Sequence, residues 1–380
     1  MNIGVWSVAG TRIHQLVQLL VVVSVALLVS ACGPGARDVQ HPLTDSLASA
    51  FYPDHLADAQ LTPPGLDIRF VRDSLLATYG AQNLPEAHII GRIGIAKLLG
   101  DDIFVLDDRL HTVHALGVRG ASHEQIGRPG QGPGELAIPR GLALSNDRLF
   151  VGDERRVIHE YLRAGGRWSW ARDIPVPFLP LDICSIGDSL YVLAVTDDLS
   201  PIIHRVEQGE LVTSFGVPYR SADMFIRYVT TEGQLVCLPE IDGIAWVPTR
   251  MDEVHMYRTD GTLRWIAQLP EYKPMGMIED TTSRTVSMGL AGGRTEMHML
   301  HAAAPVDSNL LVQVGLYDQL SVEEDTPKTI ESYLIDLNSG ATSKIAFPYS
   351  GLIGVTDTRL ALFTNDPWPR VDVFAVSEAR

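Results

Sequence analysis

The stretch Gly100–Arg156 decides the fold, because it contains the same short unit twice. The first copy reads Asp101-Asp-Ile-Phe-Val-Leu-Asp-Asp108 and the second Asn146-Asp-Arg-Leu-Phe-Val-Gly-Asp153. Each copy begins with a polar turn, continues as a short apolar strand and ends on an acidic residue. The loop between them, Gly127-Arg-Pro-Gly-Gln-Gly-Pro-Gly-Glu135, is too rich in glycine and proline to be helix or sheet interior. A repeated strand unit joined by such a loop indicates a repeat architecture.

The same unit recurs along the rest of the chain, at Gly187–Val192, Glu232–Cys237, Asp307–Val312 and Asp357–Leu362. Each copy is followed by a second apolar strand and then, in most cases, by a glycine turn. Short strands with turns about every ten residues, at a period of about 40–50 residues, predict propeller blades. We therefore expect an all-β fold, a six-bladed β-propeller of four-stranded antiparallel blades. Leu66–Arg72 would supply the outer strand of the last blade and close the ring, which removes open sheet edges.

The two copies with their loop and Pro139 resemble the NHL-type six-bladed β-propellers, especially the bacterial envelope lipoproteins of that group. The resemblance is strong over Gly100–Tyr161. Later units lack the Gly-Pro-Gly-Glu loop and keep only the spacing of the strands. The resemblance implies the six-bladed fold and adds little about activity, because function in that group is mostly undefined.

The N-terminus predicts export and lipid attachment. A short apolar run, Leu19–Val29, follows Arg12 and leads into Ser30-Ala-Cys-Gly33, which is the layout of a secretory signal. Leu28-Val-Ser-Ala-Cys32 resembles a bacterial lipobox, and this implies that Cys32 becomes the lipid-bearing first residue. We expect residues 1–31 to be the signal, 32–65 a tether to the membrane, and 66–380 the propeller. Gly33 favours the outer membrane under the sorting rule of some bacteria.

Charge and cysteine content limit the partners and the cross-links. The formal net charge is −16, which disfavours nucleic acid, because binding phosphates needs clustered Lys and Arg. Cys184 and Cys237 remain once Cys32 carries lipid. An exported chain could bridge them, but both lie within apolar strand patterns, where cysteine usually acts as a small buried hydrophobe. The sequence favours two unpaired buried thiols.

The order of strands predicts which face carries function. The loop that links one blade to the next lies on the same face as the turn between the second and third strands. We call this the loop face; it would contain Gly127–Glu135, Asp107–His111 and Asp153–Arg156. The insertions Glu271–Glu296 and Tyr317–Thr329 would join it. The turns between strands one and two and between strands three and four form the opposite face. Loops on a rigid scaffold are where binding usually occurs.

Equivalent positions at the starts of the inner strands suggest a binding site at the mouth of the central channel. Several are basic, so the mouth could hold a carboxylate, phosphate or sulfate; the alternative is that these arginines pair with neighbouring acids. The candidate ligand-binding residues are Arg92, Arg140, Arg227, His301, Asp182, Arg128, Gln131, Glu135, Asp107 and Asp153.

A binding or interaction module, for a small molecule or an envelope protein, is favoured over an enzyme. No nucleophile elbow and no phosphate-binding loop is present. The alternative is a calcium-dependent lactonase or arylesterase on the same fold, but such a site needs converging acids and Asn where this chain has basic residues. We expect no catalytic residue, no metal site and no cofactor, with calcium as the alternative at Asp107-Asp108 or Glu323-Glu-Asp325. A histidine recurs at 114, 159, 204 and 255, and we expect each to bond within its own blade.

Overall fold

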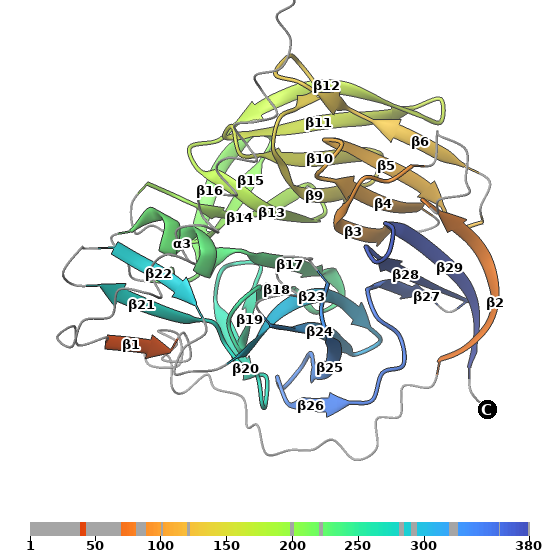
Figure 1. Ribbon diagram of the computed structural model, residues 1–380. Helices are drawn as coiled ribbons and strands as arrows, with labels where there is room; N and C mark the ends of the chain where they lie inside the picture. The colour runs from red at the N-terminus through yellow and green to blue at the C-terminus, as the bar shows by residue number, and fades with distance from the viewer. Residues whose placement is uncertain are drawn as a thin grey trace, which may run out of the picture.

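The computed structural model describes residues 39–42, 70–80, 89–99, 102–119, 122–197, 201–219, 223–280, 285–289, 295–318, 326–356 and 358–378. Six four-stranded antiparallel sheets are arranged in a ring, with one strand of each sheet at its centre (Figure 1). The prediction of an all-β, six-bladed propeller is confirmed.

The strands follow the chain from the inner to the outer edge of each blade. Blade 1 contains β3 (Ile93–Leu99), β4 (Asp102–Asp107), β5 (Thr112–Gly117) and β6 (His123–Ile126). Blade 2 contains β9 (Pro139–Ser145), β10 (Arg148–Asp153), β11 (Val157–Ala164) and β12 (Arg167–Pro175). Blade 3 contains β13 (Leu179–Ile186), β14 (Ser189–Val195), β15 (Ile203–Glu207) and β16 (Glu210–Phe215).

The second half repeats the plan with longer connections. Blade 4 contains β17 (Gly233–Leu238), β18 (Gly243–Pro248), β19 (Glu253–Arg258) and β20 (Leu263–Gln268). Blade 5 contains β23 (Glu296–Val306), β24 (Asn309–Asp318), β25 (Thr329–Asp336) and β26 (Thr342–Ile345). Blade 6 contains β27 (Leu352–Thr356), β28 (Arg359–Thr364), β29 (Arg370–Glu378) and, as its outer strand, β2 (Phe70–Tyr79).

The ring is closed by an N-terminal strand, as predicted. β2 pairs antiparallel with β29, from Phe70 opposite Glu378 to Tyr79 opposite Val371. The strand continues beyond the expected Leu66–Arg72. The sequence pattern did not show this, because two register shifts after Arg72 interrupt the alternation of side chains. Residues 66–69 lie outside the described residues.

Apolar side chains fill the spaces between blades. Each buried cluster draws on two adjacent blades, so every blade is held by both of its neighbours. Tyr79 illustrates the closure: its ring is buried against blades 6 and 1, and its hydroxyl donates to the carbonyl oxygen of Gly117 at 2.6 Å. Burial of apolar area between blades is the main stabilising contribution.

The prediction for blade 4 was shifted by one strand. Glu232–Cys237 was expected to be a second strand, with an inner strand beginning near Arg227. Glu232–Cys237 instead leads into and forms most of the inner strand β17, and Arg227 lies in helix α3 (Met224–Thr231). The helix forms because the carboxylate of Asp223 accepts hydrogen bonds from the N–H groups of Phe225 and Ile226.

Two connections are elaborated, and both fall where the sequence placed them. Between β20 and β23 the insertion forms β21 (Gly276–Asp280) and β22 (Thr285–Gly289). Within the expected tether, β1 (Val39–Pro42) pairs with β21. The other insertion connects β24 to β25; its residues 319–325, including Glu323-Glu-Asp325, lie outside the described residues.

Every inner strand except β17 contains a β-bulge near its start. The extra residues are Gly94, Arg140, Leu181, His301 and Ile353. A bulge re-aims the side chain at its position. Two of the residues predicted at inner-strand starts, Arg140 and His301, coincide with a bulge. Arg92 and Asp182 lie two residues and one residue away from theirs.

Candidate functional site

Asp153 joins the turn between β10 and β11 to the loop that enters blade 2. Its Oδ2 accepts hydrogen bonds from the N–H groups of Ala137 at 2.7 Å and Ile138 at 3.1 Å, and its Oδ1 from that of Arg155 at 2.9 Å. Burial opposes ionisation, but hydrogen bonds from His159 and these N–H groups outweigh it and hold the pKa of Asp153 below its usual range. The prediction that the loop and the turn share one face is confirmed.

Asp107 has the same role in blade 1. Its carboxylate accepts from the N–H groups of Gly91 at 2.5 Å, Arg92 at 3.2 Å and Leu110 at 2.8 Å. Burial again opposes ionisation, and bonds from His114 and the backbone keep the pKa of Asp107 lowered. The oxygens of both predicted acids are therefore engaged by the backbone, and the two residues shape the loop face.

The Gly127–Glu135 loop is held by a ring of polar contacts. Glu135 accepts from the N–H of Gly132 at 2.8 Å and from Nε of Arg128 at 2.8 Å, and these bonds lower its pKa. Arg155 donates to the carbonyl oxygens of Gln131 at 3.2 Å and Glu135 at 2.9 Å. The structure thus brings Arg128, Gln131 and Glu135 together, with Arg128 paired rather than open.

Arg140 lies at the bulge of β9 and forms the centre of a cluster from two parts of the ring. Its Nε donates to Glu154 Oε1 at 2.6 Å, and the hydroxyl of Tyr228, on α3, donates to the same oxygen at 3.2 Å. Burial opposes protonation of Arg140, but Tyr228, Glu154 and Glu232 outweigh it and raise the pKa of the guanidinium. Its two terminal nitrogens have no hydrogen-bond partner among the described residues.

Arg92 and Arg227 have different surroundings. Arg92 forms a two-pronged pair with Asp108, at 2.7 Å from Nε to Oδ1 and 2.6 Å from Nη2 to Oδ2. Arg227 is buried and donates to the carbonyl oxygens of Thr196 at 3.3 Å and Asp197 at 3.1 Å. Arg227 therefore fixes α3 to blade 3.

His301 is not a cation at the mouth. It stacks on Phe363, with ring centroids 5.2 Å apart, and burial lowers its pKa to about 4. At neutral pH the ring is therefore uncharged. The basic mouth expected from the sequence therefore reduces to arginines that each pair with an acid, Arg92 with Asp108, Arg128 with Glu135 and Arg140 with Glu154.

Asp182 is fully buried on the inner strand β13 and bonds to two other blades. Lys97 of β3 places its Nζ 3.3 Å from Asp182 Oδ1 and 2.6 Å from the carbonyl oxygen of Ile183. The other carboxylate oxygen accepts from the N–H of Leu235 on β17 at 2.7 Å. Burial raises the pKa of Asp182, and Lys97 and the backbone bonds oppose the shift. Asp182 thus links blades 1, 3 and 4.

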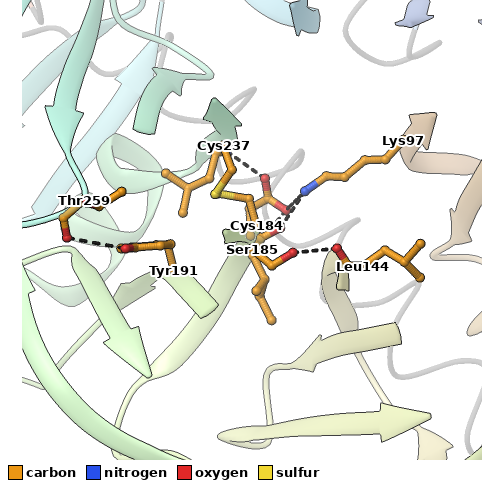
Figure 2. Close-up of a disulfide and its surroundings, with 10 residues drawn as sticks. Lys97, Leu144, Cys184, Ser185, Tyr191, Cys237 and Thr259 are labelled. Carbon is orange, nitrogen blue, oxygen red and sulfur yellow. Dashed lines mark hydrogen bonds and ion pairs between the residues drawn. A yellow bond between two sulfur atoms is a disulfide. The ribbon is translucent and has the colours of Figure 1, made fainter. Parts of the chain in front are cut away.

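A disulfide joins the same inner strands, and the expectation of unpaired thiols was wrong. Cys184 of β13 and Cys237 of β17 are bonded, with Cα atoms 5.6 Å apart (Figure 2). Both residues do lie in apolar strands, but adjacent inner strands approach closely near the centre of the ring, and this spacing is within the range of a disulfide. Cys237 also lines an open groove of about 440 Å³ on the opposite face.

The recurring histidines bond within their own blades, as expected. His114 lies 3.4 Å from Asp107 and 2.9 Å from His123. The partners in the next blades are Asp173 for His159, Ser214 for His204 and Glu253 for His255.

The two faces of the ring differ in apolar and charged character, a feature that the sequence reading missed. Large apolar side chains are exposed on loop-face segments at Ile89, Leu110, Ile138, Phe225 and Trp368. Among the described residues, the opposite-face turns expose no large apolar side chain. They carry instead Asp147, Asp188, Glu240, Asp242, Asp260 and Asp307, with Arg119 as their basic residue among those described. Hydropathy could have found this difference once the turns were assigned to faces.

No group of three or more His, Cys, Asp or Glu residues is arranged to hold a metal ion within the part of the chain that the structure describes. Over the same residues, no helix is both long and apolar enough to span a membrane.

Solved structures share this fold. A protein described as exported, from Bacteroides fragilis, superposes with a TM-score of 0.51 at 12% identity, over 82% of this chain and 95% of that one. A member of the DUF4221 family from Bacteroides vulgatus gives a TM-score of 0.52 at 9% identity, over 81% and 98%. No family model and no curated protein matches the chain. At such low identity these likenesses show the fold alone, and the NHL resemblance stays a prediction.

Proposed function

We propose that this chain is a lipid-anchored binding module of the bacterial cell envelope that acts through its loop face. The observation that carries the proposal is that loop-face segments expose large apolar side chains, while the described opposite-face turns expose none. Exposed apolar side chains on one face are a common feature of interaction sites. The lipobox-like Leu28–Cys32 supports attachment through Cys32, and Gly33 favours the outer membrane.

Lipid attachment and binding are tested separately. Cells that express the full chain are fed a radiolabelled fatty acid, and the label should be found on the protein and be lost in Cys32→Ala. A photo-crosslinking amino acid at Gln131, on the loop face, should then capture a neighbour in intact envelopes. The matched position is Asp188, on the opposite face. Adducts from Asp188 alone, or from neither position, would contradict binding through the loop face.

A small anion at the channel mouth is the second candidate, favoured by the two terminal nitrogens of Arg140, which have no partner in the part of the chain that the structure describes. A guanidinium with two free N–H edges can hold a carboxylate or phosphate with paired bonds. Glu154 and Glu232 nearby limit the charge that such a ligand can carry.

Titration calorimetry with acetate, citrate and inorganic phosphate tests the anion site. Arg140→Ala should abolish any binding seen, and Arg128→Ala should leave it, since Arg128 belongs to the loop and is paired to Glu135. Equal affinity in the Arg140 variant would remove this candidate.

A further inference from the structure

Exposed apolar residues on the loop face form an arc over adjacent blades. Trp368 is 51% exposed in the turn between β28 and β29, and Leu110 is 38% exposed in the turn between β4 and β5. The segment that links blade 6 to blade 1 joins them. Gly80 of that segment lies against Pro369 and Ile90, and Gly91 lies against Leu110.

The apolar character continues around the ring. Ile138 is exposed where the chain enters blade 2, and Phe225, on α3 between blades 3 and 4, is 57% exposed. Asp223 and the buried Ile226 fix α3, so Phe225 is presented by a packed element. Aromatic and aliphatic side chains held on rigid elements are suited to insertion into a lipid interface, where Trp is enriched.

Charge distinguishes the same two faces. On the loop face, basic and acidic side chains are interspersed and largely paired, as in Arg92 with Asp108 and Arg140 with Glu154. The opposite-face turns carry more acidic than basic residues, among them Asp147 and Asp307, although Asp188 pairs with Arg148. Bacterial lipid surfaces that contain anionic headgroups repel acidic surfaces and attract basic ones. The loop face therefore meets such a bilayer at the lower electrostatic cost.

The length of the tether limits how far the ring can lie from the membrane. β1 begins at Val39, seven positions after Cys32. Seven residues span at most about 25 Å when fully extended. β1 pairs with β21, in the insertion between β20 and β23, and this insertion starts on the loop face, because the hydroxyl of Tyr272 donates to the carbonyl oxygen of Thr249 at 3.2 Å. Figure 1 draws β1, β21 and β22 together at the outer edge of the ring.

We infer that the loop face rests on an anionic phospholipid bilayer, with Leu110, Phe225 and Trp368 inserted at the headgroup level. The inference rests on the proposed lipid attachment at Cys32 and names the surface that the loop face binds. The acidic opposite face then points away from the membrane.

The orientation is measured on the full lipidated chain in vesicles of phosphatidylethanolamine and phosphatidylglycerol. A nitrobenzoxadiazole dye is attached to one new cysteine at a time: Gln131→Cys on the loop face, Asp188→Cys on the opposite face and Leu211→Cys on the outer rim. Spin-labelled lipid should quench the dye at position 131 several-fold more than at 188 or 211. Equal quenching at all positions, or stronger quenching at 188 or 211, would overturn the inference.

The apolar arc is tested by combining Leu110→Ser, Phe225→Ser and Trp368→Ser in the lipidated chain. Quenching at position 131 should fall to the level at position 188. The matched control combines Leu211→Ser and Val212→Ser on the rim, where both side chains are also exposed, and should change nothing. If the triple variant keeps full quenching at position 131, the arc does not hold the face on lipid.

Two failures remain distinguishable. If mass spectrometry finds no lipid on Cys32, the proposed anchoring fails, and no dye position will report vesicle contact. If the chain is lipidated and position 131 stays unquenched while a crosslinker there captures a protein, the loop face binds a protein, and the membrane inference is wrong while the binding module stands.

Discussion

The loop face and the opposite face are built from the same strands but are held in different ways. On the loop face, buried carboxylates such as Asp107 and Asp153 each bind N–H groups from two segments of chain. The opposite-face turns use bonds of shorter range, in which the carboxylates of Asp260 and Asp336 accept from N–H groups of their own turns, together with one disulfide near the ends of β13 and β17. The face with longer connections therefore needs more side-chain bonding to keep its shape, because long loops lose more entropy on ordering.

The largest expected effect is on the opposite-face side, from loss of the disulfide. Replacing Cys184 and Cys237 with Ser should lower the free energy of unfolding by roughly 4 kcal/mol, because the cross-link closes a long loop in the unfolded chain. The sequence separation is 53 residues. Urea unfolding of the oxidised protein and of the double variant measures the difference. An unchanged midpoint would mean that the cross-link does not form in the folded protein.

A smaller effect is expected on the loop face from Asp153→Asn, which should cost about 2–3 kcal/mol, because a buried carboxylate loses charge-assisted bonds to backbone donors. Asp147→Asn, in an opposite-face turn, is the matched control and should change stability by less than about 0.5 kcal/mol. If both variants unfold at the same urea concentration, the contrast between the faces is wrong.

The difference in stability between the wild-type protein and Asp153→Asn should depend on pH, in a direction set by the lowered pKa of Asp153. The pKa of Asp153 is lowered in the folded state, so its contribution is present above the unfolded pKa of about 4 and is lost as pH falls through the folded value. The gap between the wild-type protein and Asp153→Asn should therefore be constant near neutral pH and should narrow below about pH 4. A gap that widens on acidification would contradict the assignment.

Asp252 also lies on the loop face, but its effect on the pH dependence of stability should have the opposite sign. Burial, followed by the charge of Glu253, raises its pKa to about 6, and its Oδ1 is buried with no hydrogen-bond partner among the described residues. A raised carboxyl pKa means that stability falls as pH rises through about 6. Asp252→Asn should stabilise the protein by about 1–2 kcal/mol at pH 7 and have little effect near pH 4. Thermal unfolding at the two pH values tests this, and destabilisation at pH 7 would refute it.

The smallest effect is expected from an exposed pair on the opposite-face side. Arg148 contacts Asp188, whose side chain is 80% exposed. Exposed ion pairs contribute about 0–1 kcal/mol, so Asp188→Asn should leave the thermal midpoint nearly unchanged. A loss comparable to that of Asp153→Asn would show that this face also depends on side-chain bonds.

The sequence predicted the blades well, because each is written in local patterns. Turn residues such as Asn146-Asp147 precede apolar strands in nearly every copy, and the β2 closing strand follows from the need to pair the last sheet. The local pattern did not predict blade 4 correctly. A short 3-10 turn at Pro239–Ile241 replaces the usual Asp or Asn turn there, and α3 precedes the inner strand.

The candidate site was predicted in part. Arg140 lies near the start of the inner strand β9, at its bulge, and its role in ligand binding stays a prediction, whereas Asp182 bonds to Lys97. A bulge inserts one residue without a local signature, so side-chain directions near it cannot be read from alternation. The disulfide depends on the distance between two strands of different blades, which no local pattern records.

The pairing of β2 with β29 has a consequence for how the protein is made. Synthesis proceeds from the N-terminus, so Phe70–Tyr79 is made long before its partner Arg370–Glu378. Until that partner is made, the backbone of β2 has no native strand beside it, while the first blades can already pair their own hairpins. Blade 6 is therefore the last sheet of the ring that can form.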